Sequence, residues 1–286
     1  MKTKLWIFLM VFGALVLKAQ THRFYYELDF RKDSLSNDRT QDLYVLDIDR
    51  KEVKFYGERL LKADSLMNLE NYNELAVSGK AKLYPDLDIR LKRSIGSDEN
   101  TAFHLMNAKT YYVFKTKDKQ VWKLLPENKT IKGYKVQKAT TQFGGRHWEA
   151  WFTTEIPFAE GPYKFKGLPG LILEIYDDRK DYVFVFAGNK TLKETIDSSS
   201  FLEQNLGRDK PIEISEKKYN QLKLDYYNAP FKDFGGNDTF YVIENGTYVQ
   251  KKIDTRERVR KVQERLRKDN NPIELDKAVK YPQSKD

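Results

Sequence analysis

The stretch GPYKFKGLPGLILEIYD, residues 161–177, joins a corner rich in proline and glycine to a strongly hydrophobic run. Within it, Leu-Pro-Gly-Leu at 168–171 predicts a type II turn, because proline presets φ at the second position and glycine supplies positive φ at the third. Gly167 predicts a point where another backbone passes closely. The chain should turn sharply here and enter a buried strand over 171–177. The structural motif of this corner comprises Gly161, Pro162, Gly167, Leu168, Pro169 and Gly170.

A hairpin signal lies just upstream of this corner. Two strand-like runs, residues 134–143 and 146–153, flank Gly144-Gly145. A two-residue primed turn needs positive φ, so this pair predicts a tight hairpin with Thr141 facing Trp148 and Lys138 facing Trp151. The two tryptophans would then lie on opposite faces of the sheet. Because both are large and apolar, we expect both faces to be at least partly covered.

Strand patterns dominate the rest of the chain as well. Residues 171–177 and 182–188 predict a second hairpin, with Ile175 opposite Phe184 and Leu173 opposite Phe186. Helical spacing appears at 215–228, with Ser215 as the cap, and at 255–270; Asn245-Gly246 predicts a further hairpin turn. The fold class is therefore mainly β (α+β), a curved antiparallel sheet or half-barrel with flanking helices. Further strands are expected at 23–30, 42–48, 52–57, 110–116 and 120–125.

The first 19 residues have the form of a secretory signal peptide, with two early lysines, an apolar run from Leu5 to Leu17 and small residues at its end. That run falls short of the roughly 20 residues that a spanning helix needs. We expect export to the periplasm, a single domain over residues 20–276 and a disordered tail over 277–286. The chain has no cysteine, so disulfides, thiol catalysis and a lipid-modified N-terminal cysteine are excluded. The formal net charge of +9 indicates acidic envelope partners or a solvated surface, since nucleic acid is not expected there.

The residue types needed for common catalytic sites do not gather in the sequence. His22, His104 and His147 are far apart, whereas a zinc site needs three or four convergent ligands. No G-x-S-x-G or HExxH motif occurs. We therefore expect no metal, no cofactor and no catalytic residue. Carboxylates near the corner could pair for acid–base work, but a polar strand face is the simpler interpretation of Glu149, Glu155, Glu160 and Glu174.

The aromatic residues around the corner are the strongest indication of function. They could line a cleft for an apolar small molecule, a lipid, a peptide or a sugar, or they could fill a large β core. The candidate ligand-binding residues are Trp122, His147, Trp148, Trp151, Tyr163 and Phe165. The cationic helix over 255–270 could bind an anionic surface or an outer-membrane protein, or could simply face solvent.

Several segments together resemble a known family. GLPGLILEI at 167–175, AWFTTEIPFAEGPYKF at 150–165, KTIKGYKVQKATTQFGGRHWEAWF at 129–152 and NNPIEL at 270–275 are similar to the GLPGLI family of exported Bacteroidota proteins. The resemblance implies an exported protein of unknown biochemical function and offers no catalytic or binding residue to transfer. Val136 stands where members of that family often have cysteine. The rhythm of residues 131–158 is also similar to the curved half-barrel of LolA-like lipoprotein carriers, an analogy at the level of fold alone.

These observations leave three functions open. The first is a non-enzymatic periplasmic binding or accessory protein of the cell envelope that works through a cleft near residues 161–170. The second is an envelope scaffold that docks an outer-membrane partner through its basic helix. The third is an envelope hydrolase with paired carboxylates, which would show two such groups converging in a cleft.

Overall fold

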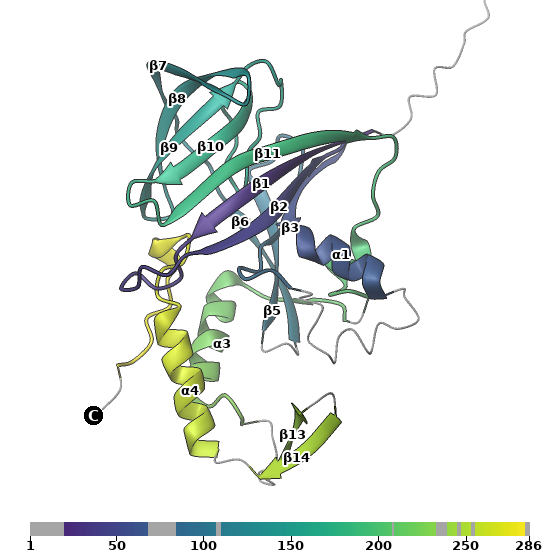
Figure 1. The fold of residues 1–286 in the computed structure, drawn as a ribbon, viewed down its shortest axis with the longest axis vertical. Helices are drawn as coiled ribbons and strands as arrows, with labels where there is room; N and C mark the ends of the chain where they lie inside the picture. The colour runs from purple at the N-terminus through teal and green to yellow at the C-terminus, as the bar shows by residue number, and fades with distance from the viewer. Residues whose placement is uncertain are drawn as a thin grey trace, which may run out of the picture.

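The computed structural model describes residues 20–67, 84–106, 110–207, 209–232, 239–244, 247–252 and 255–283 (Figure 1). The predicted signal peptide, the predicted Asn245-Gly246 turn and the last three residues lie outside these ranges. No helix within them is both long and apolar enough to cross a membrane.

The described chain is built on one open, strongly curved sheet of twelve strands (Figure 1). Its spatial order is β12-β6-β5-β4-β3-β2-β1-β11-β10-β9-β8-β7, antiparallel throughout except for the β12–β6 pair. The first six strands are β1 (Thr21–Phe30), β2 (Thr40–Ile48), β3 (Glu52–Gly57), β4 (Arg90–Ser94), β5 (Glu99–Met106) and β6 (Thr110–Lys117). The others are β7 (Lys123–Ile131), β8 (Tyr134–Phe143), β9 (Arg146–Thr153), β10 (Leu171–Asp177), β11 (Tyr182–Leu192) and β12 (Ile212–Glu213). The predicted fold class, mainly β with a curved antiparallel sheet, is confirmed.

The connection between β6 and β7 shows how strongly the sheet curves. β7 is one edge strand and β6 lies next to the opposite edge strand, the short β12, yet only residues 118–122 separate β6 from β7 in the chain. An extended chain covers about 3.5 Å per residue, so this loop spans no more than about 20 Å. The two ends of the sheet must therefore approach each other. Across the concave side, the Tyr26 hydroxyl donates to the Ile172 carbonyl at 2.8 Å.

In both predicted hairpins, the residues that pair in the structure have the expected register. Thr141 faces Trp148 and Lys138 faces Trp151 across β8 and β9, and the turn residues Gly144 and Gly145 have φ of 62° and 72°. In the second hairpin Ile175 faces Phe184. In each case a short turn sets which residues lie opposite one another.

The sheet is covered on both faces. The concave face holds the main core, which includes Phe24, Tyr26, Phe55, Trp148 and Phe184. On the convex face, α1 (Glu58–Met67) and the short helix η1 (Ser199–Glu203) cover a second cluster. That cluster comprises Val45, Tyr56, Leu60, Ala63, Phe103, Tyr111, Phe201, Leu202 and Leu206.

Two helices lie beside each other below the concave side of β5 and β6 (Figure 1). The first, α3 (Glu216–Asn228), begins as predicted at Ser215, whose hydroxyl accepts the Lys218 N–H at 3.1 Å. The second, α4 (Thr255–Lys268), contacts α3 through Gln263, whose amide donates to the Tyr227 carbonyl at 3.0 Å. The hairpin of β13 (Thr239–Glu244) and β14 (Thr247–Lys252) forms a separate two-stranded sheet.

The C-terminal segment returns from α4 to the sheet. It includes the short helix η2 (Leu275–Lys277), and Leu275 N donates to the Gly144 carbonyl at 2.6 Å. Although the sequence predicts disorder from residue 277, Lys277 forms ion pairs and Tyr281 stacks on Tyr227 with ring centroids 5.0 Å apart. Aromatic and charged partners that are distant in sequence hold this segment in place.

Candidate functional site

The corner between β9 and β10 turns more tightly than predicted. The Gly170 N–H donates to the Leu168 carbonyl at 2.8 Å, so the turn closes across Pro169 alone and is not the predicted type II turn. A Cβ at Gly170, whose φ is 151°, would lie 2.0 Å from the Thr153 carbonyl oxygen. Gly167 has φ of 92° and open space beside it. Close backbone approach therefore explains Gly170, and positive φ explains Gly167.

The first half of the corner links the two converging ends of the sheet. Its ion pairs are Glu160 with Arg93, Lys164 with Asp118 and Lys166 with Asp98. The indole of Trp122, in the β6–β7 loop, donates to the Lys166 carbonyl at 2.8 Å. Residues 160–166 thus form a seam between β4–β6 and β9–β10, which we call the corner seam.

Four of the six predicted site residues meet beneath this seam. Phe165 is fully buried, and its ring centroid lies 4.6 Å from that of Trp148, 6.2 Å from that of Tyr163 and 6.4 Å from that of Trp122. Trp148 is also fully buried, and its indole donates to the Phe143 carbonyl at 2.9 Å. These rings fill the core rather than an open cleft. Tyr163 also lines a cavity.

The other two predicted residues lie apart from this group. His147 is exposed beside the β8–β9 turn, where its Nδ1 lies 3.0 Å from the Gln142 amide nitrogen. Trp151 lies on the opposite face of β9 from Trp148, and the ammonium groups of Lys129 and Lys138 lie 4.3 and 5.7 Å from its ring centroid. Lysine side chains thus cover the second face at this strand.

The C-terminal segment is fixed to the sheet by one buried arginine. Arg146, which is 3% exposed, donates to the backbone carbonyls of Pro272 at 2.8 Å and Ile273 at 3.1 Å. Its guanidinium also pairs with Asp177 at 2.8 Å and Asp181 at 3.3 Å, both fully buried. This network places Ile273 in the core and makes the C-terminal segment one wall of a cleft.

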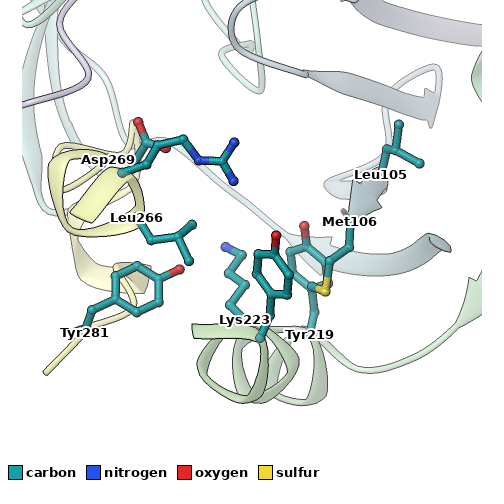
Figure 2. A pocket seen from close by; sticks show the side chains of 9 residues that line it. Leu105, Met106, Tyr219, Lys223, Leu266, Asp269 and Tyr281 are labelled. Carbon is teal, nitrogen blue, oxygen red and sulfur yellow. The ribbon is translucent and has the colours of Figure 1, made fainter. Parts of the chain in front are cut away.

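That cleft lies between the concave face of β4–β6, α3 and the C-terminal segment. Its inner cavity has a volume of about 250 Å³, and the outer cavity, of about 580 Å³, opens between α3, α4 and the end of β5 (Figure 2). Tyr219 and Lys223 line both, so the two cavities adjoin. Apolar residues of the inner cavity include Leu87, Ile89, Leu91, Ala102, Phe114, Pro272 and Ile273.

His104 lines the inner cavity as a neutral group. Its ring lies between those of Phe114 and Tyr219, with centroid distances of 4.8 and 4.7 Å. Burial, reinforced by the charge of Lys223, lowers the pKa of His104 to about 3. The imidazole is therefore uncharged at neutral pH.

Lys223 reaches from α3 into the space shared by the two cavities (Figure 2). Its side chain is half-buried, and its ammonium lies 4.8 Å from the ring centroid of Tyr219. Burial lowers the pKa of Lys223 below its ordinary value, against a smaller opposing effect of Glu216. Within the described ranges no carboxylate forms an ion pair with it.

The remaining charges of the inner cavity neutralise one another. Lys164 and Lys277 pair with Glu274 at 2.6 and 2.8 Å. Burial would raise the pKa of Glu274, but these two lysines outweigh it and hold the pKa below its ordinary value. The other pairs are Arg90 with Asp88 at 2.7 Å and Lys277 with Glu216 at 3.1 Å.

Each of the four carboxylates near the corner has a basic or backbone partner. Glu149 pairs with Lys138 at 2.7 Å, Glu174 pairs with Lys129, Glu160 pairs with Arg93, and Glu155 accepts the Lys135 N–H at 2.8 Å. A glycosidase-type acid needs a raised pKa, whereas the pKa of Glu149 is lowered because its hydrogen bonds to Lys138 and Tyr176 outweigh burial. In the part of the chain that the structure describes, no three histidine or carboxylate side chains gather as a metal site would require.

Sequence reasoning did not find the residues that form the cleft. Lys223 and Tyr219 lie on a predicted amphipathic helix, but its partner surface includes β4 and β5, which the sequence did not predict. Glu274 lies in the NNPIEL segment at 270–275, whose resemblance to the family ending was the one available signal.

Comparisons with known proteins give limited further information. A family model described as "Protein of unknown function (Porph_ging)" matches residues 144–174, from the β8–β9 turn into β10. This match is consistent with a GLPGLI-like Bacteroidota family. No curated protein matches the chain in sequence.

Two solved structures are similar to the chain. They are those of PNGF-II in the P21 and C2 space groups, each 18% identical, with TM-scores of 0.48 and 0.49. The similarity covers 71% and 80% of this chain but 33% and 36% of those chains, so this chain spans about a third of their length.

Proposed function

We propose that this chain is a GLPGLI-family protein, exported by residues 1–19 to the periplasm without a lipid anchor, that binds an apolar small molecule. The binding site is the cleft between β4–β6, α3 and the C-terminal segment, and the protein acts as a non-enzymatic binding or accessory protein of the cell envelope. The observation that carries this proposal is the inner cavity, whose walls are mainly apolar and which adjoins the larger outer cavity.

The dimensions and the walls of the cleft support ligand binding. Small-molecule sites are concave, mostly apolar and roughly 300–1,000 Å³ in volume, with a few polar groups that set orientation. The outer cavity falls in this range, and the inner cavity of about 250 Å³ extends it. Tyr163, on the wall nearest the seam, has positive φ of 58° and is buried, and such backbone strain gathers at functional sites.

The cleft lies beside the corner seam, near residues 161–170 as the sequence analysis expects, and Tyr163 and Lys164 of the seam line its inner cavity. Lys164 belongs to the seam and also pairs with Glu274 of the C-terminal wall. The seam therefore helps to position the cleft. The buried aromatic rings around Phe165 pack against the seam in the core.

A scaffold function remains the second candidate because of the exposed cationic side chains of α4. These include Arg256, Arg260, Lys261, Arg265 and Lys268. Reversing the charge of Arg260 and Lys268 would release an outer-membrane partner if this surface docks one, and would leave small-molecule binding in the inner cavity intact.

Two substitutions on adjacent residues of α3 test the binding site. Asn220 lines the inner cavity, whereas Gln221 is exposed. We expect Asn220→Phe to fill the cavity and weaken binding of the neutral dye Nile red about tenfold, a change of about 1.4 kcal/mol. Gln221→Phe should leave that binding unchanged. Equal affinities in both variants, or no dye binding to the wild type, would contradict the proposal.

A further inference from the structure

The charge balance of the inner cavity is incomplete. Four cations and three carboxylates line it. Arg90, Lys164 and Lys277 each pair with a carboxylate, whereas Lys223 forms no ion pair within the part of the chain that the structure describes. Neutral His104 adds no second charge beside it.

The surroundings of Lys223 favour an anion. Its ammonium is removed from part of its water and faces the ring of Tyr219 at 4.8 Å, which compensates only part of the cost of burying a charge. A bound anion would provide the missing partner and stabilise the charged form. The position of Lys223 at the junction of the two cavities places such an anion at the entrance to the apolar inner cavity.

We propose that the ligand of the cleft is an amphiphile with one carboxylate, which pairs with Lys223, and with an apolar chain that lies against Ala102, Phe114 and Ile273. This inference rests on the proposed function, since it specifies the chemical class that the same cleft binds. Lys223 selects the head group, and the inner cavity selects the chain.

The nearby carboxylates favour a single negative charge. Glu216 lines the inner cavity and is the carboxylate whose charge acts on Lys223, whereas Asp269 lines the outer cavity beside Arg265. Glu216 would repel a head group that carries two charges more strongly than one that carries a single charge. Decanoate should therefore bind more tightly than decyl phosphate.

The experiment measures displacement of Nile red by decanoate, decyl phosphate, decanol and decyltrimethylammonium, using the wild type, Lys223→Met and Lys217→Met. Met keeps an unbranched apolar side chain of similar reach, and Lys217 is an exposed lysine on the same helix. We expect Lys223→Met to weaken decanoate binding about 10- to 100-fold, as the loss of a charged hydrogen bond predicts. Its decanol affinity should stay within about twofold of the wild type, since that ligand needs no cation. Lys217→Met should match the wild type throughout.

Different results separate the two proposals. If Nile red and decanol bind but decanoate affinity is the same in the wild type and Lys223→Met, the cleft is a binding site and Lys223 is not its anion partner. Tighter binding of decyltrimethylammonium than of decanoate would overturn the inference in the same way, and tighter binding of decyl phosphate would overturn the single-charge head group. If the wild type binds none of the probes, both proposals fail.

Discussion

The corner region and the helical cleft differ in whether their buried charged side chains have ion-pair partners. In the corner seam Glu160, Lys164 and Lys166 each have an ion-pair partner, and at the other end of β9 Arg146 joins Asp177, Asp181 and the C-terminal backbone. In the cleft, Lys223 is half-buried beside an aromatic ring without a carboxylate partner among the described residues. The first arrangement stabilises the fold, and the second leaves an interaction for a ligand to complete.

Removing Arg146 should have the largest effect on stability. Arg146→Met would leave the fully buried Asp177 without its arginine, leave Asp181 with Arg31 alone and free the C-terminal wall. Breaking a buried ion pair on one side typically costs about 3–5 kcal/mol, so we expect a loss of this size in the free energy of unfolding.

Urea denaturation measures this loss, and the exposed Arg179 provides the control. Arg179→Met should change the free energy of unfolding by less than about 0.5 kcal/mol. If Arg146→Met and Arg179→Met have similar free energies of unfolding, the buried ion pairs of Arg146 do not stabilise the fold, and the contrast with the cleft is wrong.

Substitution of Gly170 should have the next largest effect. The new Cβ in Gly170→Ala would lie 2.0 Å from the Thr153 carbonyl oxygen, so one of the two backbones must move. We expect a loss of at least about 2 kcal/mol in the free energy of unfolding. Gly188→Ala is the matched control, because no atom lies within 4 Å of its added Cβ. A melting temperature of Gly170→Ala equal to that of the control would be inconsistent with this close approach.

The β8–β9 hairpin next to the corner could be predicted from sequence, whereas the cleft could not. Gly144-Gly145 sets the register of β8 and β9 through local backbone geometry, which a sequence shows directly. β4 escaped prediction because its charged residues are stabilised by distant partners, such as Glu160 for Arg93. The cleft combines β4–β6, α3 and the C-terminal segment, so its residues meet only through tertiary structure.

The cleft should also make stability depend on pH through His104. In the unfolded chain this imidazole takes up a proton near its ordinary pKa of 6.5, whereas in the folded protein it stays neutral down to a pKa of about 3 because of burial and the charges of Lys223, Lys164 and Arg90. Acid therefore favours the unfolded state, and the free energy of unfolding falls as the pH drops below 6.5. The slope is at most about 1.4 kcal/mol per pH unit.

Urea midpoints at pH 7 and pH 5 measure this contribution, in a range above the ordinary pKa values of the carboxylates. His104→Phe keeps a ring between Phe114 and Tyr219 and should lose most of the difference between the two pH values. If the wild type and the variant lose the same stability at pH 5, the histidine is not held neutral by the cleft.

Trp122 should contribute least of the residues considered. Trp122→Phe removes the hydrogen bond from its indole to the Lys166 carbonyl and keeps an aromatic ring near Phe165, so we expect a loss of about 1 kcal/mol. Neighbouring Val121, which is 81% exposed, provides the control, since Val121→Ala should have almost no effect on the midpoint of urea unfolding. A loss from Trp122→Phe as large as that from Arg146→Met would mean that the indole contributes as much stability as a buried ion pair.

Native mass spectrometry of the protein, purified gently from its own cell envelope, tests the central claim most directly. We predict an additional small mass on the wild type and on Gln221→Phe, and its loss from Asn220→Phe, in which the inner cavity is filled. An additional mass that persists in Asn220→Phe, or a wild type without any, would contradict the assignment of the cleft as the ligand-binding site.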